Sequence, residues 1–264
     1  MISVVIPLFN SKETYINCIT SVIDQTINPE NLEIILVDDC SFDKKYIQNI
    51  PKIFTNTNIS YKIIEHKENK GVGAARNTGI IHSKGKYIAL LDSDDKWMPD
   101  KLEKQLAIFN NYEDIIMVGT LSTMPESIIP PFTNKRLKEL NISIKQQLLK
   151  NYFQPSTVLI KSDVFNHFGW PNRRYAEEGD VFLRLFDFGK LYLINEILVD
   201  YSNGKKGFGV SGLSSNIHKT QKEEIKNIQS VYARKQISFF IFLISFIFSN
   251  MKYLRRVVLN LIKK

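Results

Sequence analysis

The chain has 264 residues, of which 44% are hydrophobic and 23% charged, a composition typical of a folded protein with room for one large domain. Its formal charge is +8, but the eight Lys and Arg residues after Glu224 account for all of it, so residues 1–224 are formally neutral. A nucleic-acid-binding domain carries its basic residues on the folded body, so this distribution argues against a nucleic-acid partner. Two cysteines without paired or metal-binding spacing are typical of a reducing, cytosolic compartment. The strand-like start at residues 1–7 argues against a secretory signal.

Strand and helix patterns alternate along the first 120 residues. The apolar spacing predicts one helix for which Ser11 is the expected cap. Apolar strands that alternate with helices predict an α/β fold, in which a largely parallel sheet has helices on both faces. The expected strands are residues 2–8, 32–37, 61–65, 87–91 and 115–120, and the expected helices are residues 14–25, 44–54, 72–83 and 99–110.

The second half carries weaker patterns, and the tail differs from both. We expect helices at residues 144–151 and 177–188, and strands at residues 156–160 and 191–199. The uncharged apolar run at residues 237–248 would be about 18 Å long as a helix, which is short against about 30 Å of membrane hydrocarbon. A basic amphipathic stretch with Lys252, Arg255 and Arg256 follows it. Together they predict a tail that lies on an anionic membrane surface; the alternative is a buried core helix with a solvated basic end.

Three carboxylates, Asp92, Asp94 and Asp95, lie within four residues directly after a predicted strand. Ligands of parallel sheets bind beyond this end of the strands, and carboxylates this close repel one another unless a cation lies among them. Because Mg²⁺ and Mn²⁺ bind one or two carboxylates together with substrate phosphates, the segment predicts a metal–diphosphate site. The alternative is a solvated acidic turn. An EF-hand loop does not fit, since Trp97 stands at the position of its glycine.

Two further segments carry candidate binding residues. One carboxylate of Asp38 and Asp39 can accept the imide N–H of a uracil, while Asp39 or Ser41 can also cap the next helix. Residues 71–77, Gly-Val-Gly-Ala-Ala-Arg-Asn, place glycines and Arg76 at a helix start, which attracts phosphate.

Four segments occur in the order and spacing of the family 2 glycosyltransferases, which the chain resembles over about residues 1–213: SVVIPLFN at 3–10, ILVDDCS at 35–41, GVGAARN at 71–77 and LDSDD at 91–95. The resemblance implies a GT-A fold, with residues 1–120 as the nucleotide-sugar-binding half, 121–215 as the acceptor-binding half and 216–264 as a membrane-associating tail. It also implies a UDP-sugar donor and a Mn²⁺ or Mg²⁺ ion. Its pattern places Pro7 against the nucleoside, Asp39 on the uracil, Arg76 near the diphosphate or base, Asp92 near the ribose and Asp94 on the metal.

The family places its catalytic base in a Glu-Asp-aromatic-Asp motif, whereas residues 177–180 here read Glu-Glu-Gly-Asp. Aligned with that motif, Glu178 takes the position of the base and Glu177 is the alternative. Asp180 has a structural explanation, because Arg184 follows it by four residues on the same predicted helix. His218 is either a further metal ligand or a structural residue.

The chain also looks similar to bacterial O-antigen and capsule transferases of this family, which add glucose or galactose to a GlcNAc or GalNAc on undecaprenyl diphosphate. The resemblance therefore implies an inverting, metal-dependent hexosyltransferase with a lipid-linked saccharide acceptor, peripheral on the cytoplasmic face of the bacterial inner membrane. The glycine-rich segment 204–215 is either a lid over the diphosphate or a linker. The rival functions are a nucleotidyltransferase with the same sheet and a non-catalytic membrane scaffold.

Overall fold

The computed structural model describes residues 1–11, 14–123, 139–171, 173, 175–201 and 216–262. Its helices are α1 (Thr14–Ile23), α2 (Lys45–Ile53), α3 (Val72–Ile81), α4 (Lys101–Asn111), α5 (Ile144–Leu149), α6 (Glu177–Leu185), α7 (Ile217–Ala233) and α8 (Phe239–Ile262). Its strands are β1 (Ile2–Leu8), β2 (Leu32–Asp38), β3 (Ser60–Glu65), β4 (Tyr87–Leu90), β5 (Lys96–Trp97), β6 (Ile115–Ser122), β7 (Glu139–Ile142), β8 (Leu159–Lys161) and β9 (Lys190–Asp200).

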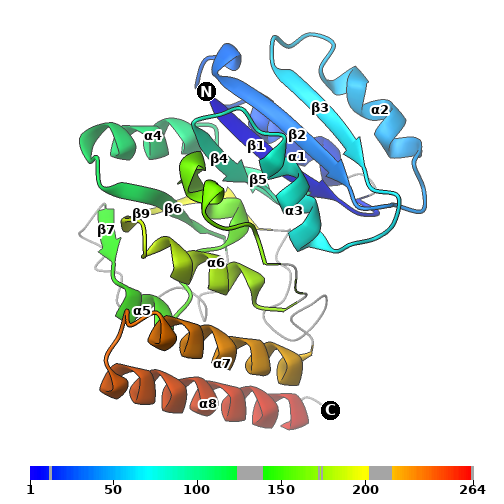
Figure 1. Cartoon of the computed structure of the whole chain (residues 1–264). Helices are drawn as coiled ribbons and strands as arrows, with labels where there is room; N and C mark the ends of the chain where they lie inside the picture. The colour runs from blue at the N-terminus through cyan, green and yellow to red at the C-terminus, as the bar shows by residue number, and fades with distance from the viewer. Residues whose placement is uncertain (12–13, 124–138, 172, 174, 202–215, 263–264) are drawn as a thin grey trace.

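One sheet forms the centre of the molecule, in the order β3-β2-β1-β4-β8-β6-β9-β5, and β7 pairs with β9 (Figure 1). The first four strands of this order are mutually parallel, and Ile2 of β1 lies beside Leu32 of β2 and Tyr87 of β4. Every residue of β1, β2 and β4 is buried, as expected for parallel strands with helices on both faces. The predicted α/β fold is therefore confirmed in this half of the sheet.

The other half of the sheet is mixed. β8 runs antiparallel to both β4 and β6, whereas β6 and β9 are parallel. The strand expected at residues 156–160 starts only at Leu159, because Pro155–Thr157 form a 3₁₀ turn. The short strands β5 and β7 were not predicted, since two and four residues are too few for a strand pattern to stand out.

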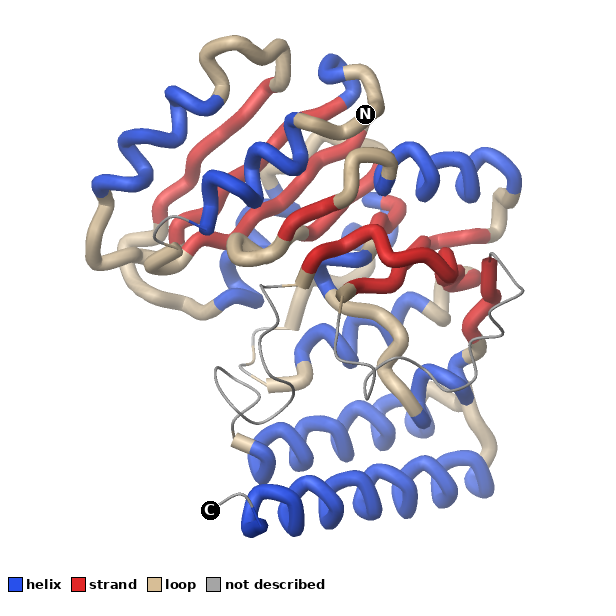
Figure 2. Tube along the Cα trace, turned by 180° about the vertical axis from the view of Figure 1, so that it is seen from behind, coloured by secondary structure: helices blue, strands red, loops and turns tan. Residues whose placement is uncertain are grey.

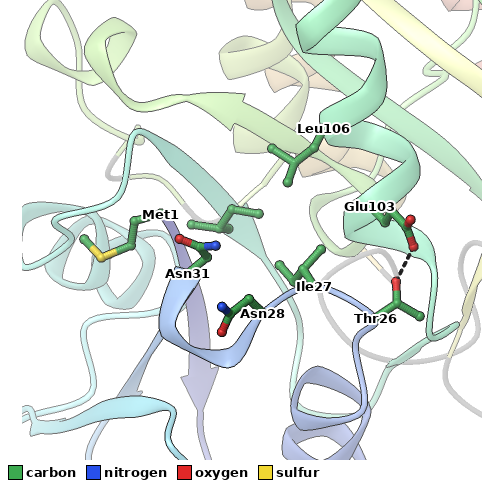
Figure 3. Close-up of a pocket in the computed structure, with 8 residues that line it drawn as sticks. Met1, Thr26, Ile27, Asn28, Asn31, Glu103 and Leu106 are labelled. Atoms are coloured by element: carbon green, nitrogen blue, oxygen red, sulfur yellow. Dashed lines mark hydrogen bonds between the residues drawn. The ribbon is translucent and has the colours of Figure 1, made fainter.

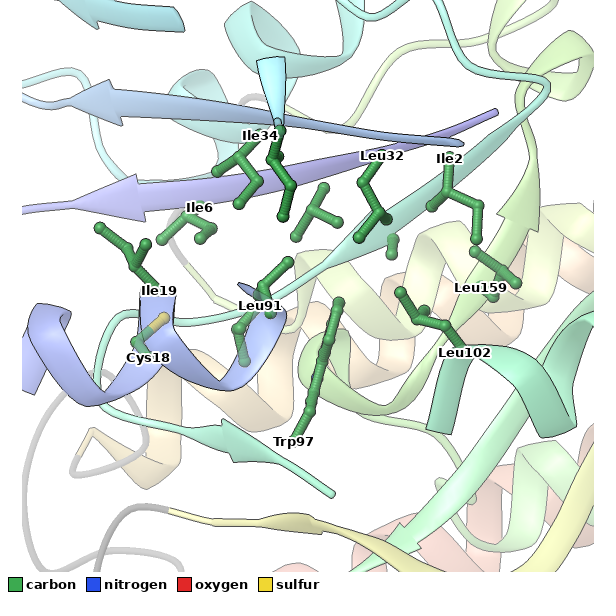
Figure 4. Close-up of a cluster of buried hydrophobic side chains, with 14 of the residues drawn as sticks. Ile2, Ile6, Cys18, Ile19, Leu32, Ile34, Leu91, Trp97, Leu102 and Leu159 are labelled. Carbon is green, nitrogen blue, oxygen red and sulfur yellow. The ribbon is translucent and has the colours of Figure 1, made fainter. Parts of the chain in front are cut away.

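The two faces of the sheet pack against different helices. Side chains alternate along a strand, so Val4 and Ile6 point to one face and Val5 to the other. The first face packs against α1, α2 and α4, and Figure 4 shows Cys18 and Ile19 of α1 under this face. The second face packs against α3 and α6. The helices therefore fix both sides of the strands whose carboxyl ends carry the predicted site.

The polar segments that follow β1, β2 and β4 meet at one edge of the sheet. The Asp39 N–H donates to the Leu8 carbonyl at 2.8 Å, and the Leu91 N–H donates to the Val5 carbonyl at 3.1 Å. These bonds continue the parallel pairing just past the strand ends. They place Asp39 and the acidic turn of residues 92–95 on either side of β1.

The tail forms a hairpin of two helices, α7 and α8, with α7 between α6 and α8 (Figures 1 and 2). Ile228 and Val231 of α7 form a small core with Leu183 of α6. The apolar run and the basic stretch, which we expected to be separate features, belong to one helix of 24 residues. The helix α7 was not predicted as an element of its own.

Helix α8 keeps much of its apolar surface exposed. The exposed fraction is 68% for Phe240 and 60% for Leu254, so the alternative of a buried core helix is wrong. None of the helices in the described part of the chain is long and apolar enough to cross a membrane.

Candidate active site

The acidic turn after β4 is built around one buried carboxylate. The Asp95 N–H donates to the Asp92 carbonyl at 3.0 Å, which closes the turn. The Asp95 side chain is 1% exposed and accepts a hydrogen bond from the Ser156 hydroxyl. That hydroxyl oxygen in turn accepts the Asp92 N–H at 3.1 Å. Asp95, whose role the sequence left open, therefore has a structural role that anchors the turn to the 3₁₀ segment at Ser156.

Asp92 and Asp94, the other two carboxylates of the turn, are both half-buried. Asp92 accepts a hydrogen bond from Nη2 of Arg76 at 2.7 Å. Asp94 is the carboxylate of the turn to which the family resemblance assigns the metal.

A protein cage for a metal ion is not formed here. Among the described residues, no three His, Cys, Asp or Glu side chains come together as a possible ligand set. Mg²⁺ and Mn²⁺ do not require one, because they are usually bound by one or two carboxylates together with waters and substrate phosphates. The residues present fit a metal ion held by Asp94 together with a diphosphate.

Arg76 joins the acidic turn to helix α6. The side chain is almost fully buried, and its Nη1 lies 3.4 Å from a carboxylate oxygen of Glu177 while Nη2 binds Asp92. The guanidinium also lies 5.0 Å from the centre of the Trp170 ring, a cation–π contact. Burial alone would lower the pKa of Arg76, but the charges of Asp92 and Glu177 outweigh it and raise that pKa. Arg76 is therefore a permanent cation between the two acidic segments.

Glu177 and Glu178, the acidic pair at the start of α6, lie in different surroundings. Burial, the charge of Glu178 and a hydrogen bond with Glu178 raise the pKa of Glu177 to about 8, against the lowering effect of Arg76. Glu177 is 4% exposed, whereas Glu178 is half-buried. The raised pKa favours the protonated form of Glu177, and Glu178 is the more exposed side chain of the pair.

The structure confirms the explanation given for Asp180. Its Oδ2 accepts from Nε and Nη2 of Arg184 at 3.0 Å, and Nη2 of Arg173 lies 3.7 Å away. The side chain is 6% exposed. Asp180 is therefore a structural partner of two arginines.

The acidic pair after β2 holds loops in place. Asp38 is fully buried and binds Ser41 and Tyr46. The expected capping of α2 by Asp39 or Ser41 is wrong, because the cap position of α2 is Lys44 and the first helical N–H, that of Lys45, donates to Oδ1 of Asp43 at 3.0 Å.

Asp39 is bound by the loop that leads into α3. Its carboxylate accepts the Lys70 and Gly71 N–H groups at 2.9 and 2.7 Å and contacts Nδ1 of His66 at 2.8 Å. Gly71 has a φ of 88°, which favours glycine. Among the contacts of the described residues, Oδ2 of Asp39 accepts only the Gly71 N–H. This oxygen therefore has a second lone pair that can accept a nucleobase N–H. The Gly71 N–H at the start of α3 donates to Asp39. It is therefore not directed at a phosphate, which is what we expected from the helix start.

Pro7 is buried in β1, one residue before the strand ends, and lies beside Val37 of β2. The structure thus brings Pro7, Asp39, Arg76, Asp92, Asp94, Glu177 and Glu178 to one edge of the sheet and the adjoining start of α6.

Three site residues were missed from the sequence. Ser156 and Trp170 contact the acidic turn and Arg76 from loops more than 60 residues away, and no local pattern marks them. Tyr201 follows β9, and burial together with the charges of Asp92, Asp95, Asp94 and Glu178 raises the pKa of its hydroxyl. An aromatic residue directly after a strand was the one available signal for Tyr201.

Other candidates lie elsewhere. His218 of α7 is exposed, and its Nδ1 lies 2.6 Å from the Tyr253 hydroxyl of α8, which supports the structural reading. The glycine-rich segment 204–215 lies outside the described residues. A hollow at the amino end of β1, opposite the acidic turn, contains none of the predicted site residues (Figure 3); it is lined by Met1, Ile2, Thr26, Ile27, Asn28, Asn31, Glu103 and Leu106.

Comparison with known proteins adds a family match. The model of the family "Glycosyl transferase family 2" matches residues 3–175. The putative teichuronic acid biosynthesis glycosyltransferase TuaG of Bacillus subtilis (strain 168) is 32% identical over 205 residues, which cover 76% of this chain and 78% of TuaG. UDP-Glc:alpha-D-GlcNAc-diphosphoundecaprenol beta-1,3-glucosyltransferase WfgD of Escherichia coli is 28% identical over 226 residues, which cover 85% of this chain and 83% of WfgD.

Solved structures share the fold. S. aureus TarS 1–349 in complex with UDP-GlcNAc matches with a TM-score of 0.68 and 17% identity, over 86% of this chain and 66% of that chain. Mannosyltransferase PcManGT from Pyrobaculum calidifontis, in complex with GDP-Man and Mn²⁺, matches with a TM-score of 0.66 and 16% identity, over 88% and 64%. The chain thus spans just under two thirds of these solved chains, and the likeness shows the fold expected from the resemblance.

Proposed function

The chain belongs to glycosyl transferase family 2, and we propose that it transfers a hexose, glucose or galactose, from a UDP-sugar to a lipid-linked saccharide in bacterial polysaccharide synthesis. The activity in the name of WfgD, glucose transfer from UDP-Glc to GlcNAc-diphosphoundecaprenol, supports this donor and this acceptor. The name of TuaG, a putative teichuronic acid biosynthesis glycosyltransferase, supports a role in polysaccharide biosynthesis. O-antigen or capsule is the polysaccharide that we propose.

One observation carries the proposal: the buried Arg76 bridges Asp92 of the acidic turn and Glu177 of helix α6. Asp92 belongs to the half of the chain that we assign to the nucleotide-sugar, and Glu177 belongs to the half that we assign to the acceptor. A single permanent cation thus holds the two acidic segments together. The bridge places the donor-binding residues next to the carboxylate base, and a sugar transfer requires both to lie close together.

In the proposed reaction the acceptor hydroxyl oxygen attacks the anomeric carbon of the donor, whose bond to the diphosphate oxygen breaks with inversion. The Glu178 carboxylate accepts the hydroxyl proton as the new bond forms. Burial and the charge of Glu178 raise the pKa of Glu177 to about 8, which favours its protonated form, and its hydrogen bond to Glu178 keeps the base in place.

The other site residues bind the donor. Asp39 accepts the uracil imide, Pro7 packs against the nucleoside and Asp92 lies near the ribose. Arg76 supplies positive charge beside the diphosphate. A Mn²⁺ or Mg²⁺ ion held by Asp94 would neutralise charge on the departing diphosphate.

We also propose that α8 binds the cytoplasmic face of the inner membrane as a peripheral element. Its exposed apolar side chains include Phe240 and Leu254, and Arg255 is exposed among them. Two of the expected basic residues face the body instead: Lys252 donates to the Leu149 carbonyl at 3.0 Å and Arg256 pairs with Glu224 at 3.0 Å. The apolar face therefore contributes more to this binding than the charge does.

A transfer assay tests the function. The purified chain with Mn²⁺ is offered UDP-Glc, UDP-Gal, UDP-GlcNAc and UDP-GalNAc in turn, each with GlcNAc- or GalNAc-diphospholipid. We expect UDP release and a hexosylated lipid with UDP-Glc or UDP-Gal, and neither with Asp94→Ala. Release of inorganic diphosphate in a separate reaction with UTP and a hexose 1-phosphate would identify a nucleotidyltransferase, and no product in any of these reactions would indicate a non-catalytic protein.

A further inference from the structure

Ala176, the residue directly before the acidic pair, has an unusual backbone. Its φ is 49° and its ψ is 30°, in the left-handed region. This region is unfavourable for residues with a Cβ atom, and Asn and Asp tolerate it better than Ala does. Neighbouring groups must therefore hold Ala176 in this conformation. The turn at Ala176 sets the direction in which Glu177 and helix α6 leave the preceding loop.

Two side chains bind the Ala176 carbonyl. Nδ2 of Asn227 donates to it at 3.0 Å and Nη2 of Arg173 donates at 3.2 Å. The same Arg173 nitrogen donates to Oδ1 of Asn227. Nη1 of Arg173 pairs with Glu223 at 3.0 Å. Because Glu223 and Asn227 are four residues apart on one face of α7, this helix holds the loop through two side chains.

Asn227 also packs against the first turn of α6. It is 5% exposed, and a Cβ atom added at Gly179 would lie 3.3 Å from its Nδ2. Its amide donor and acceptor are both used by the loop before α6. Helix α7 lies between α6 and α8 (Figure 1), so the contact reaches the acidic pair from the tail.

We propose that Asn227 is a positioning residue for the pair Glu177 and Glu178. It stabilises the left-handed turn at Ala176, which makes the hairpin of α7 and α8 part of the scaffold of the active site. This rests on the proposed function, in which Glu178 is the base. Asn227 acts through Ala176 and Arg173, and a displacement of about 1 Å in a reacting group is enough to lower a rate by up to roughly 100-fold.

Steady-state kinetics of Asn227→Ala test the proposal. We expect kcat to fall about 10- to 100-fold, while KM for the UDP-sugar changes by less than about two-fold because the donor contacts are left intact. Glycine adopts the left-handed turn without help, so adding Ala176→Gly to Asn227→Ala should restore part of kcat. Gln221→Ala is the matched control: it removes another buried amide of α7, whose bond at 3.2 Å joins Ser249 of α8. We expect this control to keep its kcat.

An unchanged kcat in Asn227→Ala, or an equal loss in Gln221→Ala, overturns the proposal. Hydrogen–deuterium exchange over residues 175–182 gives a readout that needs no activity: Asn227→Ala should raise it and Gln221→Ala should not. A wild-type chain that transfers no sugar refutes the proposed function, and the exchange result then decides alone whether Asn227 holds the turn.

Discussion

Replacing Glu177 by Gln should change how stability depends on pH. Burial and the charge of Glu178 raise the pKa of Glu177 from its ordinary 4.5 to about 8. Between these values the folded chain binds more protons than the unfolded chain. The stabilisation from this group is therefore complete below the lower value and is lost as the pH rises through the higher one.

The size of the effect follows from the same two values. One pKa unit corresponds to about 1.4 kcal/mol, and the titration of this single group lowers the free energy of unfolding by about 2 kcal/mol between about pH 6 and pH 8. Arg76, which lies 3.4 Å from the Glu177 carboxylate, opposes the rise in pKa and so limits the effect. Gln has nearly the shape of the protonated acid and does not titrate, so the variant should lose less stability across this range.

Urea unfolding followed by tryptophan fluorescence measures this change, because Trp97 and Trp170 are both buried. Wild type and Glu177→Gln are compared at several pH values across the range. Glu196→Gln is the matched control, since that carboxylate is half exposed and pairs with Lys104 on the surface. Equal pH slopes for wild type and Glu177→Gln would refute the account of the buried acid.

Three further predictions concern other parts of the chain. Ser156→Ala removes the hydroxyl that binds the buried Asp95 carboxylate, so the free energy of unfolding should fall by about 1–3 kcal/mol, and an unchanged melting temperature would contradict this. Burial lowers the pKa of Lys101 well below 10.5 in the folded chain. At pH values below 10.5 the unfolded chain therefore binds a proton that the folded chain does not, so the free energy of unfolding rises as the pH approaches 10.5. Lys101→Met should flatten this alkaline slope in urea unfolding, and an unchanged slope would show that the amine stays charged. Phe240→Asp and Leu254→Asp should each weaken sedimentation with anionic lipid vesicles roughly ten-fold. Asn58→Asp is the control, because Asn58 is exposed in the loop between α2 and β3, and it should bind like the wild type. Full binding by both α8 variants would refute the membrane proposal.

The donor side of the site could be predicted from the sequence because each of its segments follows a strand. Asp39 comes directly after β2 and Asp92 lies two residues after the end of β4, and parallel strands bring their carboxyl ends to one edge. The four motifs fixed which carboxylates to choose. Their individual contacts were beyond prediction: the sequence does not reveal that Asp95 turns inward to Ser156 or that Arg76 reaches across to Glu177.

The acceptor side depends on contacts between distant segments. Glu178 is proposed as the base from a motif that matches only in part, and the difference between Glu177 and Glu178 arises from burial, which a sequence of two adjacent acids does not show. Asn227 lies 51 residues after Ala176, on a helix that was not predicted. The division of the chain into a donor half, an acceptor half and a tail stays a prediction.

The most direct test of the central claim compares Glu178→Gln with Glu177→Gln in the UDP-sugar transfer assay at neutral pH. We expect Glu178→Gln to lose at least about 100-fold in kcat, because the base that accepts the hydroxyl proton is gone. Glu177→Gln mimics the protonated acid and should keep at least about a tenth of kcat. The reverse result, a severe loss in Glu177→Gln with near-normal turnover in Glu178→Gln, would contradict the assignment of Glu178 as the base.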